Sequence, residues 1–121
     1  MKRVSYLAFT AVSIFLALTF FILPVLAYTS PGKPQGFVND FANVLTIQGK
    51  TAIENKISDF KKNSGLEMAV VIIPNLVDET IETYAVKLFE EWGIGNKEKD
   101  NGVLFLIAVN DKKMRIEVGY G

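Results

Sequence analysis

The chain contains 121 residues, 13 of them basic and 13 acidic; about half are apolar, and none is cysteine or histidine. Without cysteine there is no disulfide, thiolate nucleophile or iron–sulfur site, and without histidine there is no Ser-His-Asp triad or usual zinc site within this chain. The balanced charge, which forms no basic stripe, argues against nucleic acid as a partner. The chemistry left to the chain uses carboxylates, amides, backbone groups, lysine, arginine or a hard cation.

An apolar leader occupies residues 1–27. Lys2 and Arg3 precede an uncharged run, Val4–Leu23, which a proline ends before the small or apolar residues that lead to Ala27. This order predicts an export signal that is cleaved after Ala27. The run would also measure about 30 Å as a helix, enough for a retained membrane anchor. In either case we expect the remaining residues to be exported across the membrane, as a secreted or anchored extracytoplasmic domain.

The residues that follow the leader are expected to be irregular at first. Proline and glycine in residues 28–36 predict a linker, and the mixture of apolar anchors and Asx turns in residues 37–45 predicts a loop pinned to the core. Thr46 is a plausible N-cap for a helix that ends near Ser64, where Gly65 suits a left-handed stop. The apolar stripe of this helix is expected at Ala52 or Ile53, Ile57 and Phe60.

Two apolar runs, Met68–Ile73 and Val103–Val109, predict strands that are covered on both faces. Between them a second helix is expected from about Glu79 to Trp92, and Gly93 ends it. The residues predicted to share its buried side are Ile81, Ala85, Leu88 and Trp92.

The last segment, after a turn at residues 110–113, alternates apolar residues with polar or small ones. The apolar set is Met114, Ile116, Val118 and Tyr120, and the other set is Arg115, Glu117 and Gly119. Such alternation predicts a final strand that has one wet face and pairs back as a hairpin.

The order helix, strand, helix, strand, strand predicts an α/β fold. Two buried strands joined by a helix form a right-handed parallel crossover, and the two helices can lie on opposite faces of the sheet. The result is an α/β/α sandwich around a small mixed sheet. Three strands and two helices are few for a freestanding α/β domain, so residues 37–121 are interpreted as a domain that is incomplete at its C-terminus.

Asp40, Asp100 and Asn101 are the candidate metal ligands. Both aspartates lie in predicted loops beside an amide and ahead of strongly apolar segments, and carboxylate, amide and backbone oxygens suit Ca²⁺ or Mg²⁺. The alternative is that each aspartate only closes an Asx turn or caps a helix. No DxDxDG spacing is present to favour the metal site.

Three other groups of residues have simple structural explanations. Gly93 and Gly95 close a helix, whereas a phosphate cradle needs glycines that open one. Asp78, Glu79 and Glu82 gather near the carboxyl end of the first strand and could help to hold a cation, but complementing the helix dipole also explains them. The aromatic residues of the second helix are expected in core and rim packing; they are Tyr84, Phe89 and Trp92.

Five stretches carry a family resemblance. In chain order they are VNDFANVL at 38–45, SGLEMAVVII at 64–73, IETYAVKLFEEWGIG at 81–95, DNGVLFLI at 100–107 and RIEVGYG at 115–121. In this combination they resemble the TPM domain family, over nearly the whole chain from Phe37 onward. That family includes a thylakoid-lumen phosphatase-like protein, a photosystem II repair protein and many exported bacterial proteins.

The resemblance implies an exported domain that binds a divalent cation, since relatives bind divalent metal and the similar stretches include Asp40 and Asp100. It favours a non-catalytic accessory module that assists the assembly or turnover of membrane proteins. One alternative is a metal-assisted phosphomonoesterase, although the sequence has no nucleophile with a paired base, no phosphate loop and no arginine cluster. The other is an interaction partner of a membrane receptor or channel, as animal members of the family are.

Overall fold

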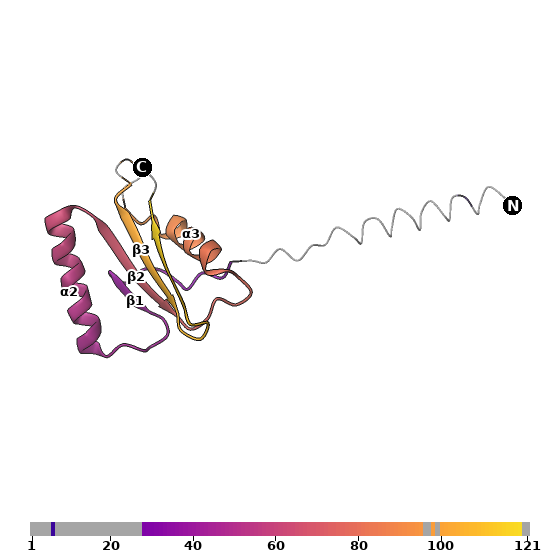
Figure 1. Cartoon of the computed structure of the whole chain (residues 1–121), viewed down its shortest axis with the longest axis horizontal. Helices are drawn as coiled ribbons and strands as arrows, with labels where there is room; N and C mark the ends of the chain where they lie inside the picture. Colours follow the sequence, from indigo (N-terminus) through magenta and orange to yellow (C-terminus); the bar gives the residue numbers. More distant parts are fainter. Residues whose placement is uncertain (1–5, 7–27, 96–97, 99, 120–121) are drawn as a thin grey trace.

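The computed structural model describes Tyr6 and residues 28–95, 98 and 100–119. Within them, a four-stranded mixed sheet carries one helix on each face (Figure 1). The strands, in their order across the sheet, are β1 (Val38–Asp40), β2 (Glu67–Ile73), β3 (Gly102–Ala108) and β4 (Lys113–Val118), and the helices are α2 (Ile47–Ser64) and α3 (Ile81–Trp92). This arrangement confirms the predicted α/β sandwich. Tyr120 and the leader, apart from Tyr6, lie outside the described residues.

The segment after the linker contains a short strand, β1, where the sequence predicted only a loop. β1 runs parallel to β2, with Val38 opposite Val70. The pairing extends past both ends of β1, because Val70 N–H donates to Phe37 O at 2.7 Å and Phe41 N–H donates to Ile72 O at 2.8 Å. A strand of three residues is too short to show a period of two, so it leaves no periodic signal in the sequence.

The two parallel crossovers of the sheet differ in hand. Both step the same way across it, from β1 to β2 and from β2 to β3, yet α2 and α3 lie on opposite faces (Figure 1). Two such crossovers must be of opposite hand, so one of them has the left-handed sense that is rare in parallel sheets. β4 then returns antiparallel to β3, as the predicted hairpin requires.

Both helices begin and end at residues whose capping chemistry is visible in the sequence. The Thr46 side chain accepts a hydrogen bond from a backbone N–H in the first turn of α2, and Gly65 ends this helix with a φ of 74°. Thr80 caps α3 in the same way, so α3 begins slightly later than expected. Gly93 ends α3 with a φ of 57°, a left-handed conformation that costs glycine little.

The main core lies between α3 and the sheet. Ile81, Ala85 and Leu88 are buried there as predicted, and Trp92 packs against them at the rim. Tyr84 is also buried, which confirms the expectation of core packing for the aromatic residues of this helix. The sheet contributes Ala69, Val71, Ile73, Leu104, Leu106 and Ala108.

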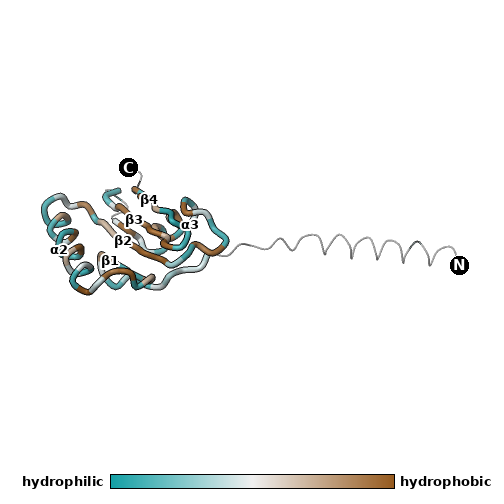
Figure 2. Tube along the Cα trace, turned by 60° about the horizontal axis from the view of Figure 1, so that its bottom comes forward, coloured by the Kyte–Doolittle hydropathy of each residue, from teal (hydrophilic) through white to brown (hydrophobic). Residues whose placement is uncertain are grey.

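The opposite face of the sheet is only half covered. α2 lies beside β1 and β2 (Figure 2) and buries Ile57 there, whereas Phe60 stays 42% exposed. The β3 side chains on this face are only partly buried; they are Val103, Phe105 and Ile107. β3 therefore has one buried face instead of the two that its apolar run predicted, because no element within the described residues lies over this half of the sheet.

The apolar residues of β4 lie on its exposed side, a choice of face that the alternation in the sequence left open. The strand has one solvated face, and that face carries Met114, Ile116 and Val118, which are 62%, 56% and 51% exposed. The polar pair, Arg115 and Glu117, lies on the α3 side, where Glu117 is buried. The pairing with β3 fixes this orientation, since residues directly opposite each other share a face of the sheet.

Candidate functional site

Asp40, the first predicted metal ligand, is the last residue of β1. Its Oδ2 accepts a hydrogen bond from Leu45 N–H at 2.8 Å, which closes the loop between β1 and α2. Its Oδ1 is buried and has no hydrogen-bond partner within the described part of the chain. One oxygen therefore serves as the turn alternative expects, and the other is a buried carboxylate oxygen that a cation or a donor would stabilise.

Asp100 and Asn101 lie directly before β3. The Asn101 side-chain amide donates to Gly65 O at 2.8 Å, and its backbone carbonyl accepts from Glu67 N–H at 2.8 Å. Asn101 thus ties the start of β3 to the end of α2 and the start of β2. Asp100 has a φ of 44°, a conformation that aspartate and asparagine adopt more readily than most residues.

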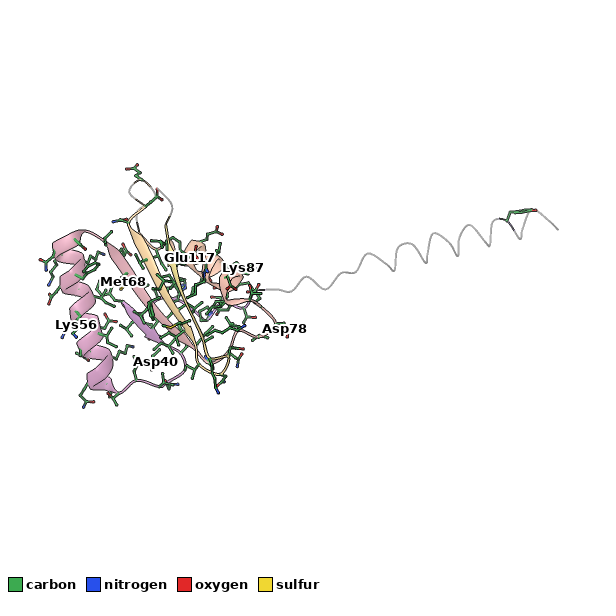
Figure 3. All side chains as sticks on the ribbon, in the orientation of Figure 1. Asp40, Lys56, Met68, Asp78, Lys87 and Glu117 are labelled. Carbon is green, nitrogen blue, oxygen red and sulfur yellow. The ribbon has the colours of Figure 1, made fainter. Side chains whose placement is uncertain are left out.

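The two aspartates of the predicted metal site lie at opposite ends of the sheet. Asp40 is level with Ile72 and Ile107, whereas Asp100 precedes Gly102. The strand from Gly102 to Ile107 is about 17 Å long, and a cation binds its ligands within about 2.6 Å. Figure 3 shows Asp40 at the lower end of the sheet, while β3 begins at the upper end. One ion cannot bind both aspartates, so metal binding stays a separate prediction for each.

No group of three histidine, cysteine or acidic side chains that could hold a metal ion occurs among the residues with described positions. A cation at either aspartate would therefore depend on backbone carbonyl or amide oxygens for most of its ligands.

Two glycines make a backbone contact beside Asp100. A Cβ on Gly95 would lie 2.4 Å from Gly102 N, and a Cβ on Gly102 would lie 2.4 Å from Ile94 O. Gly93 and Gly95 form the predicted helix stop, with Ile94 buried between them. The sequence gives no sign of this contact, because the contact joins the end of α3 to the start of β3 across the loop between them.

A shallow depression lies next to this contact, between α3 and β4. It is lined by Val86, Phe89, Glu90, Asp100, Glu117, Val118 and Gly119. Glu117 is buried at its edge, and Arg115 Nε donates to its Oε2 at 3.0 Å. The pair neutralises the buried charge, so we interpret Glu117 as structural. Sequence reasoning missed its burial because the alternation in β4 fits either orientation of the strand.

The acidic residues before α3 are explained by the structure of its N-terminus. Thr80 is the N-cap, and Glu82 lies in the first turn, where its charge complements the helix dipole. Glu79 forms an ion pair with Lys87, and Asp78 is exposed (Figure 3). Val77 has a φ of 50°, which is strained for a β-branched residue. Glu82 thus acts on the helix and Glu79 on a lysine, and with Asp78 they form no metal-ligand group among the described residues.

The predicted linker, residues 28–36, has no regular structure but is fastened to α3; we call it the strap. Tyr28 Oη and Ser30 Oγ each donate to the Glu91 carboxylate at 2.7 Å. Trp92 Nε1 donates to a strap carbonyl at 2.9 Å. The strap therefore behaves as part of the domain and not as a flexible connection.

The two tyrosines in this contact have raised pKa values. Their rings meet edge to face with centroids 5.0 Å apart, and the Tyr84 hydroxyl donates to Thr29 O at 3.1 Å. Burial, followed by the hydrogen bond to Glu91, raises the pKa of Tyr28 far above its ordinary value. Burial and the nearby Glu91 carboxylate raise the pKa of Tyr84 to about 12. Neither phenol is suited to act as a base near neutral pH.

A contiguous apolar surface remains on the α2 side of β3 and β4. We call it the open face, and it consists of the cross-strand pairs Val103 with Val118, Phe105 with Ile116 and Ile107 with Met114. The β3 members are partly buried, and the β4 members are more than half exposed. Apolar surface gathered in this way marks a site of interaction more often than singly scattered apolar residues do.

Comparison with known protein families accounts for nearly the whole described fold. The family model of the TPM domain matches residues 38–121, a stretch that includes all four strands and both helices. The chain belongs to the TPM domain family. The match to the family model thus confirms the resemblance that the five sequence stretches of this TPM domain indicated.

A solved structure has the same fold as this TPM domain. It is the N-terminal domain of a protein from P. gingivalis, determined in solution by NMR, and it matches with a TM-score of 0.69 and 26% sequence identity. The match covers 79% of this chain and 66% of the other, slightly less than two thirds of its length. Among curated proteins no match is found.

The helices that the structure describes do not include one with both the length and the apolarity to cross a membrane. The run Val4–Leu23, for which the sequence predicts an export signal or an anchor, lies outside the described residues.

Proposed function

We propose that this TPM domain is a non-catalytic binding module, exported or anchored by its N-terminal segment, that acts on membrane proteins outside the cytoplasm. The observation that carries the proposal is the open face. A sheet that exposes more than half of Met114, Ile116 and Val118 leaves apolar area in water that a protein partner would cover.

The N-terminal segment supports the proposed location. Lys2 and Arg3 precede the apolar run Val4–Leu23, which is the charge order of an export signal or of an anchor whose positive end stays inside. The strap follows directly and is bound to α3. A retained leader would therefore hold the domain close to the membrane surface.

Site-specific photo-crosslinking in the host cell tests this function. A photoreactive residue at position 116 lies in the open face, and one at position 47 is the matched control, because Ile47 is 83% exposed but lies on α2 away from β4. We expect adducts with membrane-spanning proteins, identified by mass spectrometry, from position 116 alone. Equal labelling from both positions, or adducts with cytoplasmic proteins only, would contradict the proposal.

A second candidate function is cation binding at Asp40, and the buried Oδ1 without a partner favours it. Asp40 and backbone oxygens of the following loop would hold Ca²⁺ or Mg²⁺ there. For a phosphomonoesterase, the alternative implied by the family, such an ion would supply a Lewis acid. The donor set contains one carboxylate among the described residues, which favours weak binding.

Titration of the protein with Ca²⁺ and with Mg²⁺, followed by NMR, tests this candidate. We expect chemical-shift changes in residues 40–45 that disappear in Asp40→Asn and persist in Asp100→Asn. An assay with p-nitrophenyl phosphate on the same proteins checks hydrolysis. Titrations without shifts in this loop would remove the site, and activity that Asp40→Asn leaves unchanged would remove its part in hydrolysis.

A further inference from the structure

Asn101 and Gly102 form an Asn-Gly pair at the start of β3. In such a pair the asparagine side chain can react with the backbone nitrogen of the glycine. Glycine favours this reaction because it has no Cβ to shield the nitrogen and a wide range of backbone conformations. The pair contacts the end of α2, the start of β2 and the segment that follows α3. We call this meeting point the joint; its other residues are Gly65, Glu67, Ile94 and Gly95.

Three contacts of the joint hold the two reacting groups in place. The Asn101 side-chain amide donates to Gly65 O at 2.8 Å, and the Asn101 backbone carbonyl accepts from Glu67 N–H at 2.8 Å. Gly102 N lies against Gly95, where an added Cβ would come within 2.4 Å of it. To react, the Asn101 side chain and the peptide that follows it must both rotate. Both rotations break contacts, so the closed joint blocks the reaction.

The fold needs both members of this labile pair. An aspartate at position 101 could not donate to Gly65 O, because an ionised carboxylate only accepts hydrogen bonds. A side chain at position 102 would place its Cβ 2.4 Å from Ile94 O, a backbone atom that cannot move aside alone. The contacts that close the joint therefore require the dipeptide that reacts when the joint opens.

We propose that Asn101 is a site of spontaneous deamidation that is controlled by opening of the joint. In the open joint, Gly102 N forms a bond to Asn101 Cγ and the bond from Cγ to Nδ2 breaks. Ammonia leaves and takes the proton of the Gly102 amide. Water then opens the cyclic imide at either of its carbonyls. The product is an aspartate, or an isoaspartate in which the backbone runs through the former side chain.

The reaction prevents the joint from closing again. Both products carry a carboxylate in place of the neutral amide, so the hydrogen bond to Gly65 O is lost. The isoaspartate also lengthens the backbone by one atom ahead of β3, which displaces the carbonyl that accepts from Glu67 N–H. Deamidation is thus a one-way switch, because a joint that has opened and reacted stays loosened.

Rates of deamidation test the inference. The full chain in neutral lipid nanodiscs and a peptide with the sequence of residues 98–105 are kept at mildly alkaline pH, and mass spectrometry of their digests locates the products. We expect Asn101 to react at least tenfold more slowly in the folded protein than in the peptide, because only the open fraction reacts. Gly95→Ala, which forces Gly102 away, should raise the rate at Asn101 severalfold. Asn63, in the last turn of α2, is the internal control and should not change.

Circular dichroism shows whether Gly95→Ala is folded. If it is not, urea below the unfolding transition serves to open the joint of the original protein, and Asn101 should then accelerate more than Asn63. Equal rates in the folded protein and the peptide would overturn the inference. An Asn101 that reacts no faster in folded Gly95→Ala, or an equal acceleration of Asn63, would do the same.

Amide hydrogen exchange tests the one-way switch. In deamidated protein, separated by ion exchange, we expect the Glu67 N–H to exchange at least tenfold faster than in unmodified protein, since its acceptor has moved. Val109 N–H is the control, because it donates to Ile73 O at 3.0 Å at the opposite end of the sheet. Unchanged exchange at Glu67 would refute the switch.

Discussion

Gly102 and Gly65 show that glycine can be required for two unrelated reasons. Gly65 has a φ of 74° and nothing within 4 Å of where its Cβ would lie, so only the left-handed backbone favours glycine there. Gly102 starts a regular strand, but its Cβ would meet a backbone carbonyl 2.4 Å away. A backbone atom cannot move aside as a flexible side chain does, so the second requirement is the stricter one.

Alanine substitution should separate these two reasons. We expect Gly102→Ala to lower the free energy of unfolding by about 3 kcal/mol, because the strand and the loop at Ile94 must part. Gly65→Ala should lower it by about 1 kcal/mol, the cost of a left-handed alanine. Urea denaturation followed by circular dichroism measures both. Similar losses in the two variants would show that the close contact is not maintained.

β4 contains an ion pair within the strand, Arg115 with Glu117, whose carboxylate is buried. Glu117 is 5% exposed, and its Oε2 accepts from Arg115 Nε two residues earlier on the same face. A buried carboxylate is tolerated when it is paired and becomes strongly unfavourable when its partner is removed. The pair therefore keeps the polar side of β4 against α3 and leaves the apolar side outside.

Removing the arginine should expose this dependence. We expect Arg115→Met to lower the free energy of unfolding by about 3 kcal/mol, since Glu117 remains buried without its partner. Lys113→Met is the control on the same face of β4, and it should change stability by less than about 0.5 kcal/mol. Adding Glu117→Leu to Arg115→Met should recover most of the loss. Thermal and urea unfolding of the four proteins check these values. An Arg115→Met variant that is as stable as the original protein would rule out the buried pair.

The helices and strands differ in how well they could be predicted from the sequence. α2 and α3 were predictable because their caps, Thr46 and Gly93 among them, act within one turn of the helix. β1 was missed because its pairing partner, Val70 in β2, lies far along the chain. The alternation in β4 revealed the strand and its hairpin, but not which face meets the core. That choice depends on α3 and on the Arg115–Glu117 pair.

At the scale of the whole molecule, topology decides which residues can act together. Asp40 ends a parallel strand and Asp100 precedes one, so the sheet keeps them apart although both follow the same local pattern. Their separation was not predictable without β1. The strap is the other long-range feature: it joins the start of the domain to Glu91 near the end of α3.

The strap should release at high pH. The raised pKa values of Tyr28 and Tyr84 mean that the fold favours the protonated phenols, so their contribution to stability is complete below about pH 10 and is lost as pH rises toward 12 and beyond. We expect the free energy of unfolding to fall in this range, together with delayed tyrosinate absorbance.

Tyr28→Phe should flatten this pH dependence, because it removes one of the two raised phenols. Tyr6→Phe is the control, since Tyr6 is 71% exposed and lies outside the strap. Unfolding curves measured from pH 8 to 12 compare the three proteins. An unchanged slope in Tyr28→Phe would show that the phenol does not sit against α3.

Tyr28 is the residue directly after Ala27, and its side chain is held on α3 together with that of Ser30. A processing peptidase that cuts between Ala27 and Tyr28 needs an extended chain on both sides of the scissile bond. The docked strap prevents this unless it detaches locally. If the leader is cleaved after Ala27, cleavage would then come before docking or wait for local detachment of the strap. The relative timing of cleavage and of strap docking, more than the composition of the leader, would decide whether the polypeptide is released or stays tethered.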